Sequence, residues 1–189
     1  MTDVDQSLLD RVASKLSMPP SYAEAGTKAS ILTVAAASYG SRPTTEDVTQ
    51  PTGFDPDAAA LFEAVVEAAY VVAVADGHFD DAERAAFEHV VLAACEGIVA
   101  EGQVSALLAD LADQVDEDGI DKRIAMVAKT VTKPEHAQEV LRVAALLAHV
   151  SGGVSDVERE VLDKLTHEFG LDTDSLERAL EEAVTALSE

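Results

Sequence analysis

Acidic side chains crowd one short segment of the sequence, and their type and spacing suit metal binding. This segment, "ADGHFDDAERAAF", spans residues 75–87. Its carboxylates could supply oxygen ligands to a hard divalent cation, a chemistry that favours Ca²⁺ or Mg²⁺ over Zn²⁺. The candidate metal ligands are Asp76, Asp80, Asp81 and Glu83. His78 lies between them and is a possible fifth ligand, although its place in the loop favours a solvated histidine.

A second segment repeats this pattern with fewer carboxylates. Asp156 and Glu158 occupy the equivalent positions 75 residues further along the chain, and they complete the set of candidate metal ligands. Ser151, however, stands where the first segment has Asp76. We therefore expect the second segment to bind a cation more weakly than the first, or not at all.

The same residues have an alternative role in starting helices. Asp80 and Glu83 show the D-x-x-E spacing of a capping box, and Ser155 and Glu158 show the S-x-x-E spacing. In a capping box each side chain accepts a hydrogen bond from the backbone N–H of the other residue, and a good N-cap stabilises the helix start by about 1 kcal/mol. The sequence leaves the metal-binding and capping roles open.

The two acidic segments belong to a longer internal repeat. Residues 61–90 match residues 136–165 at small apolar positions, at a turn glycine and at a helix start. In this alignment Gly77 corresponds to Gly152, where each copy leaves a helix. The repeat predicts two helix–loop–helix hairpins that superpose about a pseudo-twofold axis.

Other catalytic and metal-binding patterns are absent from the sequence. The acidic run at 113–121 lacks the end ligands of an EF-hand and predicts a solvated junction between two helices. The five histidines form no H-x-x-x-H or H-E-x-x-H pattern. Cys95, the single cysteine, lies in an apolar helical pattern and predicts a buried, inert thiol. We therefore expect a protein that is not an enzyme.

The charge of the chain limits its partners. The 189 residues include 36 acids and 13 bases, which gives a net charge of −23. This balance argues against nucleic-acid binding and favours cations or basic partners. Residues 1–44 are balanced in charge, so the acidic excess lies after them. The sequence shows no signal peptide and no apolar run long enough to span a bilayer, so we expect a cytoplasmic location.

Helical periodicity runs through the whole acidic part, and the expected fold is all-α. Glycines and prolines divide residues 56–187 into about seven helices, which we expect to form a compact bundle. This bundle defines an expected domain over 51–189. The preceding residues, 1–50, form an expected N-terminal helical extension with its linker.

The N-terminal extension carries two expected helices. The first is amphipathic, with Leu8, Leu9 and Val12 on one face. The second is rich in alanine and is expected over 21–39, followed by a proline-containing linker over 41–56. We expect these helices to pack on the acidic domain or on a partner.

Two motifs give the acidic domain a resemblance to a known family. "VVAVADGHFDDAERAAF" and "VLRVAALLAHVSGGVSDVEREVLDKL" resemble the two halves of the tellurite-resistance TerB family, and the likeness extends over about residues 55–185. The family's first motif falls on Asp76, Gly77 and Glu83, and the second on Gly152 and Glu158. The resemblance implies an all-α bundle with internal pseudo-symmetry and an acidic surface that binds divalent metal. It also implies association with stress-response complexes near the inner membrane rather than catalysis.

Two hypotheses for the function follow. The first is a divalent-metal-binding adaptor in a tellurite or metal stress response. The second is a structural protein–protein interaction module without a metal site, whose N-terminal helices dock on a partner or on a membrane surface. Both hypotheses expect protein partners and leave the oligomeric state open.

Overall fold

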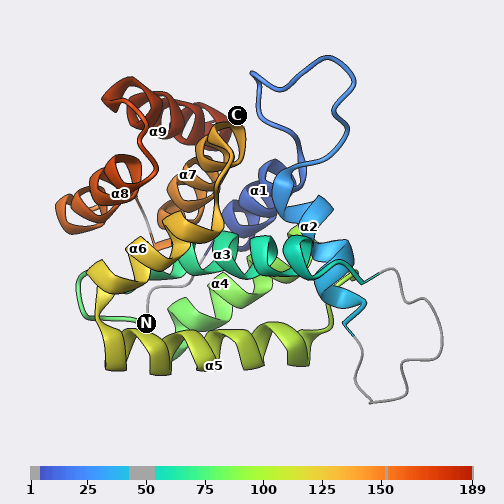
Figure 1. The fold of residues 1–189 in the computed structure, drawn as a ribbon, viewed down its shortest axis with the longest axis horizontal. Helices are drawn as coiled ribbons and strands as arrows, with labels where there is room; N and C mark the ends of the chain where they lie inside the picture. Colours follow the sequence, from blue (N-terminus) through green and yellow to red (C-terminus); the bar gives the residue numbers. More distant parts are fainter. Residues whose placement is uncertain (1–4, 43–53, 152, 189) are drawn as a thin grey trace.

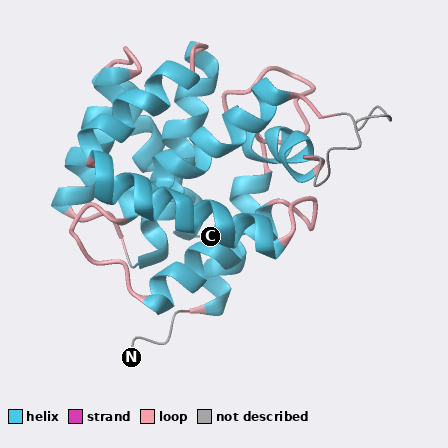
Figure 2. Ribbon diagram, turned by 60° about the horizontal axis from the view of Figure 1, so that its bottom comes forward, coloured by secondary structure: helices cyan, strands magenta, loops and turns pink. Residues whose placement is uncertain are grey.

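The computed structural model describes residues 5–42, 54–151 and 153–188. Figure 2 shows helices joined by loops, and no strand occurs among these residues. The elements in chain order are α1 (Gln6–Ser17), α2 (Ile31–Gly40), α3 (Pro56–Ala73), α4 (Asp81–Ala94), α5 (Glu101–Asp118), α6 (Ile120–Thr130), α7 (Pro134–Ala148), the 3-10 helix η1 (His149–Ser151), α8 (Asp156–Glu168) and α9 (Thr173–Ser188). The expected all-α class is confirmed.

The described part of the chain holds nine α-helices in all, whereas about seven were expected over 56–187 in addition to the N-terminal extension. Seven of them lie between Pro56 and Ser188, and α1 and α2 precede these. The expected glycine breaks separate neighbouring helices. Gly119, for example, stands between α5 and α6 with a φ of 79°, and Gly170 follows α8 with a φ of 67°. Both angles lie in the left-handed region that glycine adopts without a steric penalty.

The internal pseudo-twofold repeat is not confirmed. Both α4 and α8 begin with a capping box, as the repeat predicts. However, α7 continues into the 3-10 helix η1, whereas α3 ends in a turn. Gly152, the expected counterpart of Gly77, lies outside the described residues. Superposition of the two hairpins therefore stays a prediction.

The expected helix over 21–39 is wrong at its start, because α2 begins only at Ile31. The residues before it form turns, and Gly26 has a φ of 104° that an α-helix does not contain. The helix start is set by Ser30, whose hydroxyl accepts a hydrogen bond from the backbone N–H of Thr33. The alanine-rich composition favours a helix only weakly, and this cap decides where it begins.

The core is built mainly from alanine, valine and leucine around α3. In Figure 1, α3 crosses the middle of the molecule and α5 runs along one edge. Helices α2, α5, α6, α7 and α8 all pack against α3. Phe62, Val65 and Ala69 of α3 have no exposed surface. Small side chains let neighbouring helices approach α3 closely, which explains a core with few aromatic residues.

The two N-terminal helices pack on the rest of the chain, as expected. Helix α1 lies against α4 and α9, and α2 lies against α3. Leu9, Val12 and Ile31 are buried and belong to the same apolar core as the later helices. Burying these side chains stabilises the docked extension by removing apolar surface from water.

Two further expectations concern membrane-spanning helices and the linker between the N-terminal extension and the acidic domain. None of the helices in the described ranges combines the length and apolar character that crossing a membrane requires. The expected linker falls mostly at 43–53, outside those ranges. The division of the chain near residue 50 therefore stays a prediction.

Candidate functional site

The turn after α3 is folded by local hydrogen bonds. The backbone N–H of Gly77 donates to the carbonyl of Val74 at 3.0 Å, and Gly77 takes a φ of 77°. The carboxylate of Asp76 accepts a hydrogen bond from the backbone N–H of His78 at 2.8 Å. This Asx turn fixes the direction of the chain as it leaves α3. The Asp76 side chain therefore shapes the turn as well as being a candidate ligand.

The start of α4 is a complete capping box, as its sequence spacing predicts. Oδ1 of Asp80 accepts hydrogen bonds from the N–H groups of Ala82 and Glu83, both at 2.9 Å. Oε2 of Glu83 accepts in return from the N–H of Asp80 at 2.9 Å. Just before the cap, the Phe79 ring lies edge-on to Tyr70, with centroids 5.3 Å apart. The cap and this aromatic contact together set the angle at which α4 begins.

The start of α8 has the same arrangement with serine in place of aspartate. The hydroxyl of Ser155 accepts from the N–H of Glu158 at 3.2 Å, and Oε2 of Glu158 accepts from the N–H of Ser155 at 2.7 Å. Glu158 is buried, whereas Asp156 beside it is exposed. Glu158 is therefore a structural residue of the helix start.

The structure places the candidate metal ligands at two helix starts, and the bonds it shows run to backbone N–H groups. Asp76, Asp80 and Asp81 are exposed, and Glu83 is half-buried. No group of three or more histidine, cysteine or acidic side chains converges on a point where an ion could sit, within the residues that the structure describes. Cation binding by these residues stays a prediction, and the capping role is confirmed for Asp80 with Glu83 and for Ser155 with Glu158.

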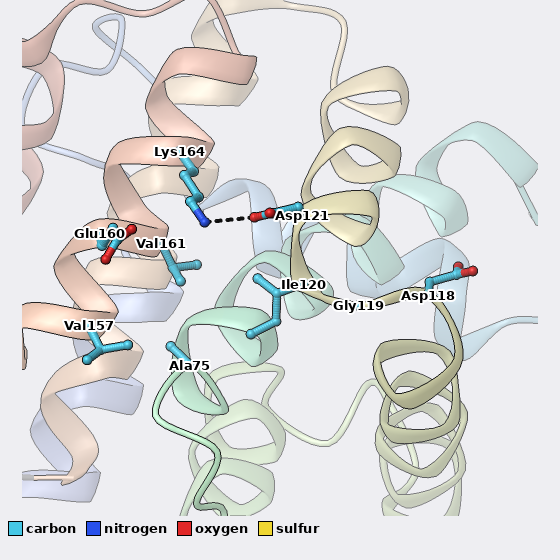
Figure 3. Close-up of a pocket in the computed structure, with 9 residues that line it drawn as sticks. All are labelled: Ala75, Asp118, Gly119, Ile120, Asp121, Val157, Glu160, Val161 and Lys164. Carbon is cyan, nitrogen blue, oxygen red and sulfur yellow. Dashed lines mark hydrogen bonds and ion pairs between the residues drawn. The ribbon is translucent and has the colours of Figure 1, made fainter.

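A hollow of about 440 Å³ lies beside the first of these turns. It is bounded by the turn after α3, the junction between α5 and α6, and one face of α8 (Figure 3). Ala75, Ile120, Val157 and Val161 give it an apolar lining, and their side chains point toward one another in Figure 3. The predicted solvated junction at 113–121 is confirmed, and its last four residues line this hollow.

An ion-pair network holds the α5–α6 junction in place. Arg123 of α6 donates to Glu67 of α3 at 2.5 Å and to Asp118 at 3.2 Å. Lys122 also pairs with Asp118. The hydrogen bonds from Lys122 and Arg123 hold the pKa of Asp118 below its ordinary value. Since Glu67 is buried in α3, Arg123 connects the junction to the core.

The charges at the hollow itself come from α6 and α8. The ammonium group of Lys164 donates to Asp121 at 2.8 Å across the opening, and this bond raises the pKa of Lys164. Glu160 lies one turn before Lys164 on α8 (Figure 3). Asp118 points away from the apolar side chains in Figure 3, and it forms ion pairs with Lys122 and Arg123.

The sequence signal for this hollow is weak. Val157, Val161 and Lys164 have the i, i+4, i+7 spacing of one helix face, which also describes a buried stripe. Only the packing of α8 beside the α5–α6 junction shows that Val157, with 45% of its surface exposed, faces solvent. These residues could therefore not be recognised as a site from the sequence.

Comparison with known proteins defines the family. The family model described as tellurite resistance protein TerB matches residues 63–181, which is more than half of the chain. The chain belongs to the TerB family. No match was found among curated proteins or among solved structures.

The TerB match covers the acidic turns and the hollow together. It runs from within α3 to within α9 and includes every residue that lines the hollow. It agrees with the resemblance expected over about 55–185. Helices α1 and α2 lie outside it, although they share the core of the TerB part.

Proposed function

We propose that this TerB family protein is a non-enzymatic adaptor in a tellurite or metal stress response and that it works by binding another protein. Family membership supports the setting. One observation supports protein binding in particular: the TerB part leaves an apolar hollow open to solvent, edged by charged side chains. The candidate metal ligands Asp80 and Glu83, by contrast, are engaged in starting α4. We place the adaptor in the cytoplasm, at most peripheral to the inner membrane.

Chemical crosslinking in cells tests the adaptor role. The full chain with an affinity tag is crosslinked in its source cells, with and without tellurite, and the products are identified by mass spectrometry. An adaptor predicts a partner that is crosslinked reproducibly and binds again when both purified proteins are mixed in a calorimeter. A chain that is crosslinked to nothing under both conditions contradicts the proposal.

Cation binding at the turn after α3 is the second candidate function. Asp76, Asp80 and Asp81 are exposed carboxylates within six residues, and both hydrogen bonds accepted by Asp80 go to the same oxygen, Oδ1. The arrangement leaves carboxylate oxygens directed to solvent, the ligands that Ca²⁺ and Mg²⁺ prefer. The partly positive start of α4 opposes a cation, so we expect weak binding.

Calorimetry of the wild type and of Asp76→Asn with Ca²⁺, Mg²⁺ and Zn²⁺ at physiological salt tests this candidate. An asparagine side chain keeps an oxygen for the N–H of His78, so the variant removes a charge and preserves the turn. We expect Ca²⁺ or Mg²⁺ to give heat with the wild type and less with the variant. Equal heats for both proteins, or no heat for either, would count against a metal site.

A further inference from the structure

The hollow lined by Ala75, Ile120, Val157 and Val161 has the features of a docking site. We propose that it binds a short basic segment of a partner protein, which inserts one aliphatic side chain between Val157 and Ile120. This inference rests on the adaptor function proposed above and names the surface and the chemistry of the partner.

The apolar lining gives the site its anchor. Val157 is 45% exposed, while Val161 beneath it is buried. Asp121, at the rim, has 78% of its side chain exposed, so the hollow is open and not an enclosed cavity for a small molecule. Its volume of about 440 Å³ falls within the range of sites that hold ligands. An inserted aliphatic side chain would remove Val157 from water, which favours binding.

The charges beside the lining select a basic occupant. Asp156, Glu160 and Asp163 follow one another along α8 at intervals of one turn, and all three are exposed. Glu160 forms no ion pair with any described residue. Lys164 is the basic residue among those that line the hollow, where it is bonded to Asp121 and also interacts electrostatically with Glu160. The charged side chains that line the hollow are three acids and one lysine, so a lysine or arginine of the partner would meet an excess of negative charge.

Other occupants fit this edge less well. A second copy of the chain would bring a net charge of −23 against an acidic edge. Nucleic acids and anionic membrane surfaces carry the same sign of charge. A basic protein segment with an aliphatic residue satisfies both the lining and the charges.

Selection from a displayed library of random dodecapeptides tests the inference. The wild type is compared with the double variant Val157→Ser/Glu160→Gln, called the hollow variant, which removes the exposed apolar group and one charge. Val184→Ser/Glu181→Gln on α9 is the matched control, because Val184 is 54% exposed and Glu181 is exposed. The two variants have the same composition, net charge and residue spacing. Their unfolding in urea is measured to show that both remain folded.

We expect the wild type and the control to enrich peptides with one aliphatic residue among several lysines or arginines. The affinity of the best peptide is then measured by fluorescence anisotropy at physiological salt. Its affinity for the control should be within about twofold of that for the wild type, and its affinity for the hollow variant should be at least about tenfold lower. Three results overturn the inference: no enrichment over the hollow variant, enriched peptides without basic or aliphatic residues, or equal weakening by both variants.

The crosslinking assay separates this inference from the adaptor function. If the wild type has a partner in cells and the hollow variant keeps it, the docking site is wrong and the adaptor function stands. If the wild type has no partner, the adaptor function itself fails.

Discussion

The burial of Arg142 makes a strong prediction about how the N-terminal helices are held. Its side chain is 3% exposed and donates to Glu182 of α9 at 2.7 Å. It also donates to the carbonyls of Lys15 at 2.9 Å and of Met18 at 3.4 Å, at the end of α1. A helix leaves its last carbonyls without partners inside the helix, and a cation there is favourable. Arg142 therefore fastens the end of α1 to α7 and α9.

Replacing Arg142 with methionine keeps much of the volume and removes all three hydrogen bonds. The Lys15 carbonyl would lose its bond to a charged partner, at a cost of about 1–2 kcal/mol. Glu182, whose side chain is 18% exposed, would lose its charged partner at a further cost of about 2 kcal/mol. We expect the free energy of unfolding, measured with urea, to fall by about 3–4 kcal/mol.

The double variant Arg142→Met/Glu182→Leu is the matched control. It removes the stranded carboxylate, so we expect it to regain about 2 kcal/mol relative to Arg142→Met alone. Hydrogen exchange should show that the amides of α1 lose the most protection in Arg142→Met. A loss below about 1 kcal/mol, or a double variant no more stable than the single one, would refute this account of Arg142.

Three further predictions concern helix starts, pH and the thiol. Asp80→Ala and Ser155→Ala should each lower the free energy of unfolding by about 1 kcal/mol in urea, because each removes an N-cap. Burial raises the pKa of Glu139 above 4.5, so its stabilising contribution is present below that pH and is lost as pH rises through the folded-state pKa. In urea unfolding, the stability of Glu139→Gln relative to the wild type should therefore rise as the pH is raised above about 4.5. Burial also raises the pKa of Cys95 to about 12, so a thiol reagent should react with it only after unfolding.

Specific results would contradict each of these predictions. Unchanged urea midpoints in the two cap variants would remove the stabilising role of the capping boxes. A stability difference between Glu139→Gln and the wild type that stays constant with pH would show that Glu139 does not titrate differently on folding. Rapid labelling of Cys95 in the native protein would contradict its burial.

Local features of the fold were predictable because they depend on neighbouring residues. The boundaries from α3 to α9 follow glycines and prolines, and the capping boxes depend on side chains three residues apart. The start of α2 was missed although its N-cap, Ser30, lies within 21–39, and a further contact at this helix start comes from a distant residue. Its first N–H, on Ile31, donates to Glu139 of α7 at 2.5 Å, and these residues lie 108 positions apart. No pattern within residues 21–39 contains that contact.

The hollow was unpredictable for the same reason. It joins Ala75, the α5–α6 junction and α8, and these parts meet only through tertiary packing. The candidate ligands were found because acidic residues are conspicuous in a sequence. Their hydrogen bonds show that acidity alone does not separate a ligand from a helix cap. In each case the residue type was visible, and the role depended on geometry.

The two proposed binding sites meet at neighbouring residues of the chain. Ala75 lines the hollow, and the next residue is Asp76, the candidate ligand in the turn. Their Cα atoms are about 3.8 Å apart, well within the distance of about 8 Å over which physiological salt screens a charge. A cation at Asp76 would therefore reduce the negative potential at the hollow and weaken its attraction for a basic segment. By thermodynamic linkage, a bound basic segment would weaken the binding of the cation by the same factor. A protein that binds both would therefore bind its partner more weakly when the cation is bound, and in this way a metal signal would reach a protein partner.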